Sequence, residues 1–66
     1  MPLEPAIHTG LETRVMAWRA IEREAELEEI WAWVVFELFP SEETRAALVG
    51  ALARLETARA ALDVLT

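Results

Sequence analysis

The stretch ELFPSEE, residues 37–43, divides the chain into two helices and so decides the fold. Proline disfavours helical geometry at the residue before it, so Pro40 should end one helix at about Leu38. Serine is a strong N-cap, and two glutamates in the next turn suit the positive end of a helix dipole, so a second helix should follow Ser41. A connection this short makes the two helices antiparallel neighbours.

The residues on either side of this stretch set the extent of each helix. Between Gly10 and Leu38 there is no further Gly or Pro, and Thr9 to Glu12 fit a capping box, so the first helix should span about 10–38. Pro2 and Pro5 predict an extended arm over residues 1–8. The sequence therefore predicts an all-α chain whose residues 9–66 form an antiparallel two-helix hairpin, with a turn at 39–41 and a second helix over about 42–65.

The second helix carries one apolar stripe, in steps of three and four residues. Folding the chain at Pro40 pairs positions whose numbers add to about eighty. The stripe then faces a matching stripe on the first helix, with small residues opposite large ones, as a close-packed core requires. On the second helix these residues are Leu48, Ala51, Leu55, Ala58, Leu62 and Leu65; on the first they are Leu11, Val15, Trp18, Ala25, Ala32, Phe36 and Phe39.

The first helix carries a second apolar stripe that nothing in its own chain can cover. Leaving its large side chains in water would forgo roughly 1.5–3 kcal/mol for each. The chain has no cysteine and one histidine, so neither disulfides nor zinc can compensate for a small core. We therefore expect self-association, most simply into a four-helix bundle dimer, or a higher oligomer. The interface should comprise Ala20, Leu27, Trp31, Val34 and Leu38.

A run of glutamates lies in the middle of the first helix. Glu22, Glu26 and Glu29 share one face, as carboxylate ligands of a metal would, but the Glu-x-x-His motif of di-iron bundles is absent. We interpret the run as a solvated face that Arg54 and Arg59 partly neutralise across the hairpin. No metal and no cofactor are expected.

Ile30 and Trp33 interrupt the polar side of the first helix. An aliphatic–indole pair among carboxylates is typical of a binding hot spot for an arginine-bearing partner. The candidate partner patch is therefore Glu26, Ile30, Trp33 and Glu37. The simpler interpretation is a wider core at this end of the helix.

Several functional classes are disfavoured by the residues present. The only serine is the expected cap Ser41, and there is no Cys or Lys to act as a nucleophile, so an enzyme is not expected. A net charge of −6 opposes binding to nucleic acid and to anionic membranes. The longest apolar stretch, Ile30–Phe39, is about half of the roughly 20 residues that a membrane span needs. Residues 1–10 lack a secretory signal, so we expect a cytoplasmic protein.

Our leading hypothesis is a non-catalytic protein–protein interaction module, a small homo-oligomeric helical adaptor, scaffold or regulatory subunit. Two alternatives stay open. One is an acidic inhibitor, of phage origin for example, that mimics nucleic acid and binds a basic protein cleft. The other is an obligate partner, such as an antitoxin or an assembly chaperone, whose apolar stripe is covered by a different protein.

Overall fold

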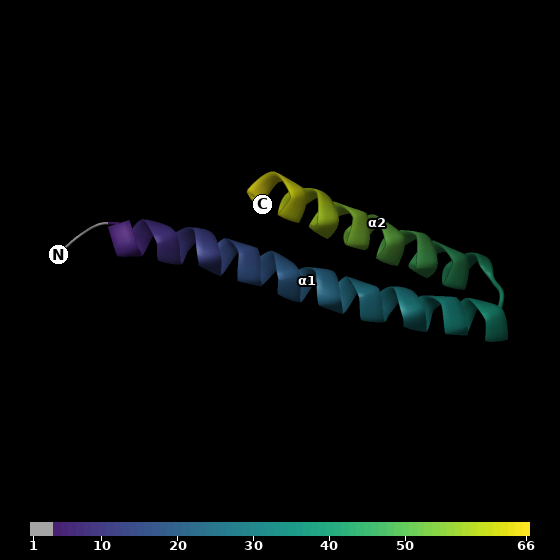
Figure 1. The fold of residues 1–66 in the computed structure, drawn as a ribbon. Helices are drawn as coiled ribbons and strands as arrows, with labels where there is room; N and C mark the ends of the chain where they lie inside the picture. Colours follow the sequence, from purple (N-terminus) through teal and green to yellow (C-terminus); the bar gives the residue numbers. More distant parts are fainter. Residues whose placement is uncertain (1–3) are drawn as a thin grey trace.

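The chain folds into a hairpin of two antiparallel helices. The structure is a computed structural model, and it describes the backbone of residues 4–66 and the side chains of residues 10–66. Helix α1 spans Glu4–Leu38 and helix α2 spans Glu42–Leu65, and they lie side by side (Figure 1). The described residues contain no strand. The predicted all-α hairpin is therefore confirmed.

The N-terminal start of α1 differs from the prediction. The helix begins at Glu4, so the expectation of an extended arm is wrong for residues 4–8, and residues 1–3 lie outside the described part. Pro5 falls in the first helical turn, where its missing N–H would have no acceptor in any case. Gly10 costs about 1 kcal/mol against alanine but does not end a helix. The Thr9–Glu12 segment, expected to be a cap, thus lies within the helix.

The turn between the helices is held by a reciprocal capping box. Ser41 has extended backbone angles, φ −156° and ψ 170°, and its Oγ accepts a hydrogen bond of 3.1 Å from the Thr44 backbone N–H. In return, the Ser41 N–H donates to Thr44 Oγ1 at 2.9 Å. Thr44 Oγ1 also donates to the Phe39 carbonyl at 2.9 Å, which ties the end of α1 to the start of α2. Two backbone donors at the helix start are thereby satisfied.

The core between the helices is narrow and consists of small residues and leucines. We call this contact the seam; its buried residues are Ala25 on α1 and Leu48, Ala51, Leu55 and Ala58 on α2. Alanines at these positions let the two helices approach closely. Half-buried side chains continue the seam on both sides: Val15, Trp18, Ala32 and Phe36 from α1, and Ala61, Leu62 and Leu65 from α2. Apart from Leu11 and Phe39, every residue predicted for the two facing stripes is therefore buried or half-buried.

Two residues expected in the seam are exposed. Leu11 is 48% exposed because α1 continues past the end of α2, so no residue of α2 lies opposite it (Figure 1). Phe39 is 69% exposed because it belongs to the turn, after the last residue of α1. The two helices therefore pack against each other only along the part of α1 from Val15 to Phe36.

Candidate interaction surface

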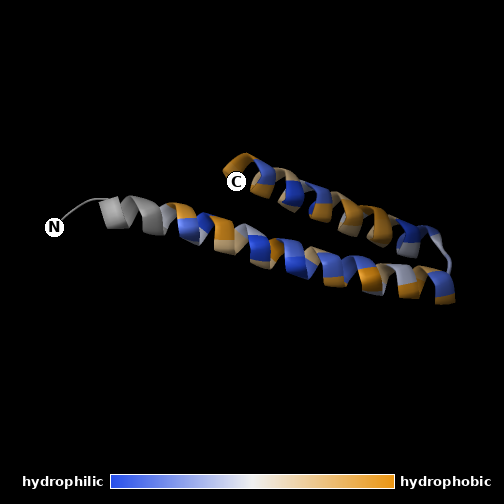
Figure 2. Cartoon of the chain, in the orientation of Figure 1, coloured by the Kyte–Doolittle hydropathy of each residue, from blue (hydrophilic) through white to orange (hydrophobic). Residues whose placement is uncertain are grey.

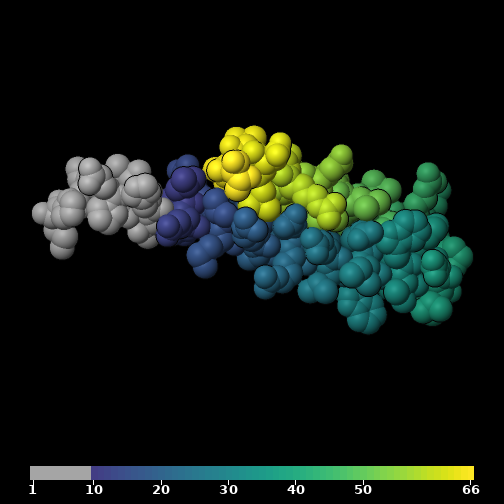
Figure 3. Space-filling view, in the orientation of Figure 1, coloured from purple at the N-terminus to yellow at the C-terminus, as the bar shows by residue number. Residues whose placement is uncertain are grey.

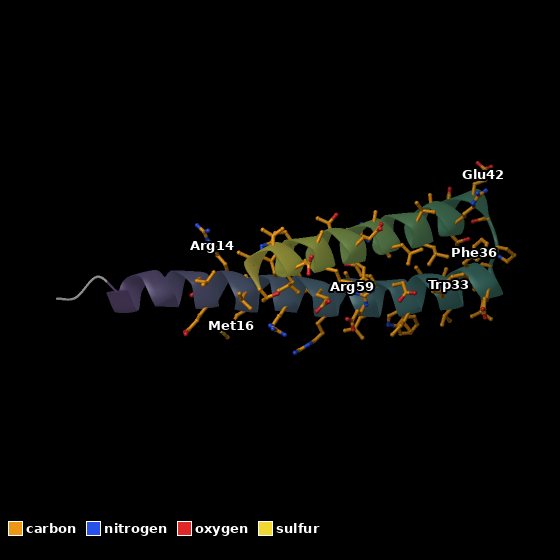
Figure 4. All side chains as sticks on the ribbon, turned by 45° about the horizontal axis from the view of Figure 1, so that its top comes forward. Arg14, Met16, Trp33, Phe36, Glu42 and Arg59 are labelled. Atoms are coloured by element: carbon orange, nitrogen blue, oxygen red, sulfur yellow. The ribbon has the colours of Figure 1, made fainter. Side chains whose placement is uncertain are left out.

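The side of α1 that faces away from α2 is apolar and uncovered. Successive helical residues are about 100° apart, which places this stripe opposite the seam. We call it the outer face; it comprises Met16, Ala20, Leu27, Trp31, Val34 and Leu38, and all six are exposed. Figure 4 shows the Met16 side chain directed away from α2. The five residues predicted to form a self-association interface thus share one exposed face.

The outer face is most apolar toward the turn. Leu27, Trp31 and Leu38 are 55%, 68% and 67% exposed, respectively. Figure 2 shows hydrophobic residues on this side of α1 near the turn, and Figure 3 shows α2 packed along one side of α1 only. Contiguous exposed apolar surface on a small protein marks an interaction site.

The hairpin has more surface than a compact protein of its mass. Its accessible surface is 5482 Å². A compact monomer of 7.4 kDa has about 4,200 Å². The radius of gyration, 16.3 Å, likewise exceeds the roughly 11 Å of a compact chain of this length. The excess of about 1,300 Å² arises because each helix has only one neighbour and the start of α1, which extends past the end of α2, has none.

The acidic run beside the seam is partly neutralised by arginines of α2. Arg59 Nε lies 3.5 Å from Glu22 Oε2, and Arg59 Nη2 lies 3.8 Å from Glu26 Oε1. Arg54 Nε donates to Glu28 Oε2 at 2.9 Å, and its Nη2 contacts the same oxygen. Both arginines therefore act across the hairpin as the sequence predicted.

The predicted partner patch lies along one flank of α1. Ile30 is 57% exposed and Trp33 is 44% exposed, so Ile30 is not part of a wider core. The Trp33 indole N–H donates to Glu29 Oε1 at 2.9 Å, and its ring meets Phe36 edge-on with centroids 6.4 Å apart. Glu37 is exposed beyond them, and Glu26 is half-buried and shares Arg59. The patch is thus a fixed indole with carboxylates on either side.

Open hollows lie on the surface of the described part of the hairpin. One, of about 310 Å³, is on the outer face and is lined by Met16, Arg19, Ala20 and Arg23. Another, of about 240 Å³, lies between the helices beside Trp18 and Arg54. A larger one, of about 450 Å³, is on α2 around Arg45 and Val49. The first was not foreseen from the sequence, although its spacing along α1 could have suggested it.

Among the described residues, no group of three or more His, Cys, Asp or Glu side chains could hold a metal ion. No buried side-chain nitrogen or oxygen in this part of the chain lacks a hydrogen-bond partner. His8 lies outside the described side chains. Neither helix, within the described range, combines the length and hydropathy needed to cross a membrane.

Comparison of the chain with protein-family models, with curated proteins and with solved structures finds no match. The outer face and the flank around Trp33 are the candidate interaction surfaces of the described residues.

Proposed function

We propose that the protein is a non-catalytic interaction module that pairs with a second copy of itself through the outer face of α1. The observation that carries the proposal is the exposed apolar stripe from Met16 to Leu38. A second copy would place two α1 helices at the centre of a four-helix assembly, with both α2 helices outside. The assembled module would then act as an adaptor, scaffold or regulatory subunit.

The amount of excess surface supports a dimer. Stable protein–protein interfaces bury about 800 Å² from each partner. The hairpin exposes about 1,300 Å² more than a compact chain of its mass; part of this belongs to the start of α1, and the rest lies along the paired helices, where one such interface can form. The apolar character of the outer face is also that of an obligate interface, which resembles a protein core cut in half.

Sedimentation velocity across the micromolar range tests the proposal. We expect the wild type to sediment as a dimer. Leu27→Glu and Val34→Glu should each raise the dissociation constant about a hundredfold, because a carboxylate at the interface loses its hydration without gaining a partner. Val64→Glu is the matched control, since Val64 is 86% exposed on α2, away from the outer face. Circular dichroism should show helices in all four proteins.

Two results would contradict self-association. A wild type that remains a well-folded monomer at about 100 μM would remove the reason to expect an interface on the outer face. Equal weakening by Val64→Glu would place the contact elsewhere on the hairpin. A folded 1:1 complex with a different protein, formed by a chain that does not self-associate, would instead make it an obligate partner such as an antitoxin or assembly chaperone.

A second candidate function, binding of a basic protein such as a target of an acidic inhibitor, is supported by the flank around Trp33. Exposed apolar side chains beside unpaired carboxylates suit an arginine-bearing surface. In the described part of the chain, Glu37 of this flank has no ion-pair partner, whereas Glu26 shares Arg59. Such binding should weaken about tenfold or more between low and physiological salt, and Trp33→Ala should weaken it further. Insensitivity to salt would count against it.

A further inference from the structure

The hollow on the outer face has the arrangement of a hole in knobs-into-holes packing. Its lining residues, Met16, Arg19, Ala20 and Arg23, follow the spacing i, i+3, i+4 and i+7 along α1. Four residues at this spacing surround the site where a side chain of a facing helix inserts. Ala20 forms a low point among three long side chains. The hollow is about 310 Å³, and no residue of α2 lines it.

Trp31 is the side chain that such a hole would accept. It is the most exposed of the three tryptophans at 68%, and it lies on the same face of α1 as Ala20. The two residues are about 16 Å apart along the helix, at 1.5 Å per residue, so Trp31 cannot reach the hole of its own chain. A second copy of the chain can bring its own Trp31 to this hole.

We propose that Trp31 of each copy inserts into this hole on α1 of the other, so that the two α1 helices pair antiparallel. The proposal rests on the self-association proposed above and adds its orientation and contact residues. In this arrangement, facing positions have numbers that add to about 51, and one two-fold axis fills both holes. Large Trp31 then faces small Ala20 twice. A parallel pair would instead set Trp31 against Trp31 and Ala20 against Ala20. Two indoles would then be too large for the space between the helices, and two alanines would leave a gap.

The residues that flank the hole suit an indole ring. A guanidinium over a tryptophan face is attracted by the quadrupole of the ring. Arg19 and Arg23 have no ion-pair partner among the described residues, unlike Arg54 and Arg59 of α2. Their long aliphatic stems also provide apolar walls for the ring. The same antiparallel pairing sets Val34 opposite Met16, which lies at the same angle around α1.

Substitutions of Trp31, the side chain that inserts, and of Ala20, at the base of the hole, test the contact. Trp31→Ala empties the hole and Ala20→Trp fills it from within; each should raise the dimer dissociation constant about tenfold or more. Ala60→Trp is the matched control, because Ala60 is exposed on α2 and should leave the constant unchanged. Unchanged dimerisation of Ala20→Trp, with helices intact by circular dichroism, would overturn the proposal.

Disulfide cross-linking tests the orientation separately. The chain has no cysteine, so single substitutions report one contact each. In an equimolar mixture of Met16→Cys and Val34→Cys, the antiparallel pair should give mainly the mixed disulfide, because these positions face each other within the roughly 7 Å that a disulfide spans. Each variant alone should cross-link slowly. Rapid cross-linking of each variant to itself would show a parallel pair and overturn the orientation while leaving self-association intact. A monomeric wild type would overturn both.

Discussion

Arg59 of α2 crosses the seam to Glu22 of α1, with Nε 3.5 Å from Oε2. The Glu22 carboxylate is the less exposed of the two groups, with 27% of its side chain accessible against 58% for Arg59. Glu22 stands within the apolar stripe of α1, one turn before buried Ala25. The contact explains how a carboxylate is accommodated beside the core, because a partly desolvated charge needs an opposite charge nearby.

This contact predicts that substitutions of Arg59 and of Glu22 change the free energy of unfolding unequally. Arg59→Met should lower the free energy of unfolding by about 1 kcal/mol, because Glu22 keeps its partly buried charge without a partner. Glu22→Met should be neutral or stabilising, since methionine adds apolar surface to the seam and Arg59 still lies near Glu26. Urea unfolding followed by circular dichroism measures both. Equal destabilisation by the two substitutions would contradict this account.

The alanines of the seam predict intolerance to larger side chains. Ala58 is fully buried, at 0% exposure, so Ala58→Leu should force the helices apart and lower the free energy of unfolding by about 1–3 kcal/mol. Ala60→Leu, two residues further along α2 on an exposed position, should change it by less than about 0.5 kcal/mol. Thermal unfolding at a fixed protein concentration compares them. An Ala58→Leu protein as stable as wild type would mean that the seam is loosely packed.

The capping box predicts a graded effect at Ser41. Ser41→Ala removes the oxygen that accepts from the Thr44 N–H and should cost about 1 kcal/mol. Ser41→Gly should cost only a few tenths, because glycine leaves the helix end open to water. Both variants keep the backbone N–H that donates to Thr44 Oγ1. We expect the Ser41→Ala protein to have a lower free energy of unfolding than the Ser41→Gly protein. The reverse order would show that the helix cap does not account for the effect.

Gly50 is a position where stability can be gained. A Cβ added there would lie 3.6 Å from Arg54 Nη1, an ordinary contact. Gly50→Ala should therefore raise the free energy of unfolding by roughly 0.5–1 kcal/mol, through the lower backbone entropy of the unfolded chain. That corresponds to a rise of several degrees in melting temperature, about 4–8 °C per kcal/mol for a domain this small.

Gly10 is the matched comparison for this prediction. A Cβ there would meet nothing within 4 Å, but Gly10 lies where α1 continues past the end of α2. Because that segment lacks the second helix, it should open locally before the hairpin unfolds. Gly10→Ala should therefore move the melting temperature less than Gly50→Ala does. A larger shift from Gly10→Ala would indicate that the start of α1 unfolds together with the hairpin.

The fold could be predicted because its deciding residues act locally. Pro40 ends one helix and Ser41 begins the next whatever the rest of the chain does, and the short turn leaves antiparallel packing as the outcome. The start of α1 could not be predicted in the same way. Pro5 is compatible with both an extended arm and a first helical turn, so the local rules do not choose between them.

The candidate surface was predictable in part. The apolar spacing of Leu27, Trp31 and Val34 shows that α1 has a second face, because periodicity alone assigns residues to faces. Which arginine pairs with which carboxylate was harder to predict, because it depends on the distance between the two helices. Alanines such as Ala51 and Ala58 determine that distance. The spacing of Met16, Arg19, Ala20 and Arg23 indicates that they are neighbours on α1, but the depth of the hole around Ala20 depends on the conformations of the three long side chains.

The uncovered outer face has a consequence for the life of the protein in a cell. If the protein pairs with a second copy as proposed, its folded state gains stability with its own concentration, by mass action. At low abundance, single copies would spend more time open and would be cut by proteases or held by chaperones. At higher abundance, pairing would withdraw the same apolar surface from those quality-control systems. Synthesis rate would thus set not only how much of the protein is present, but also how long each molecule lasts.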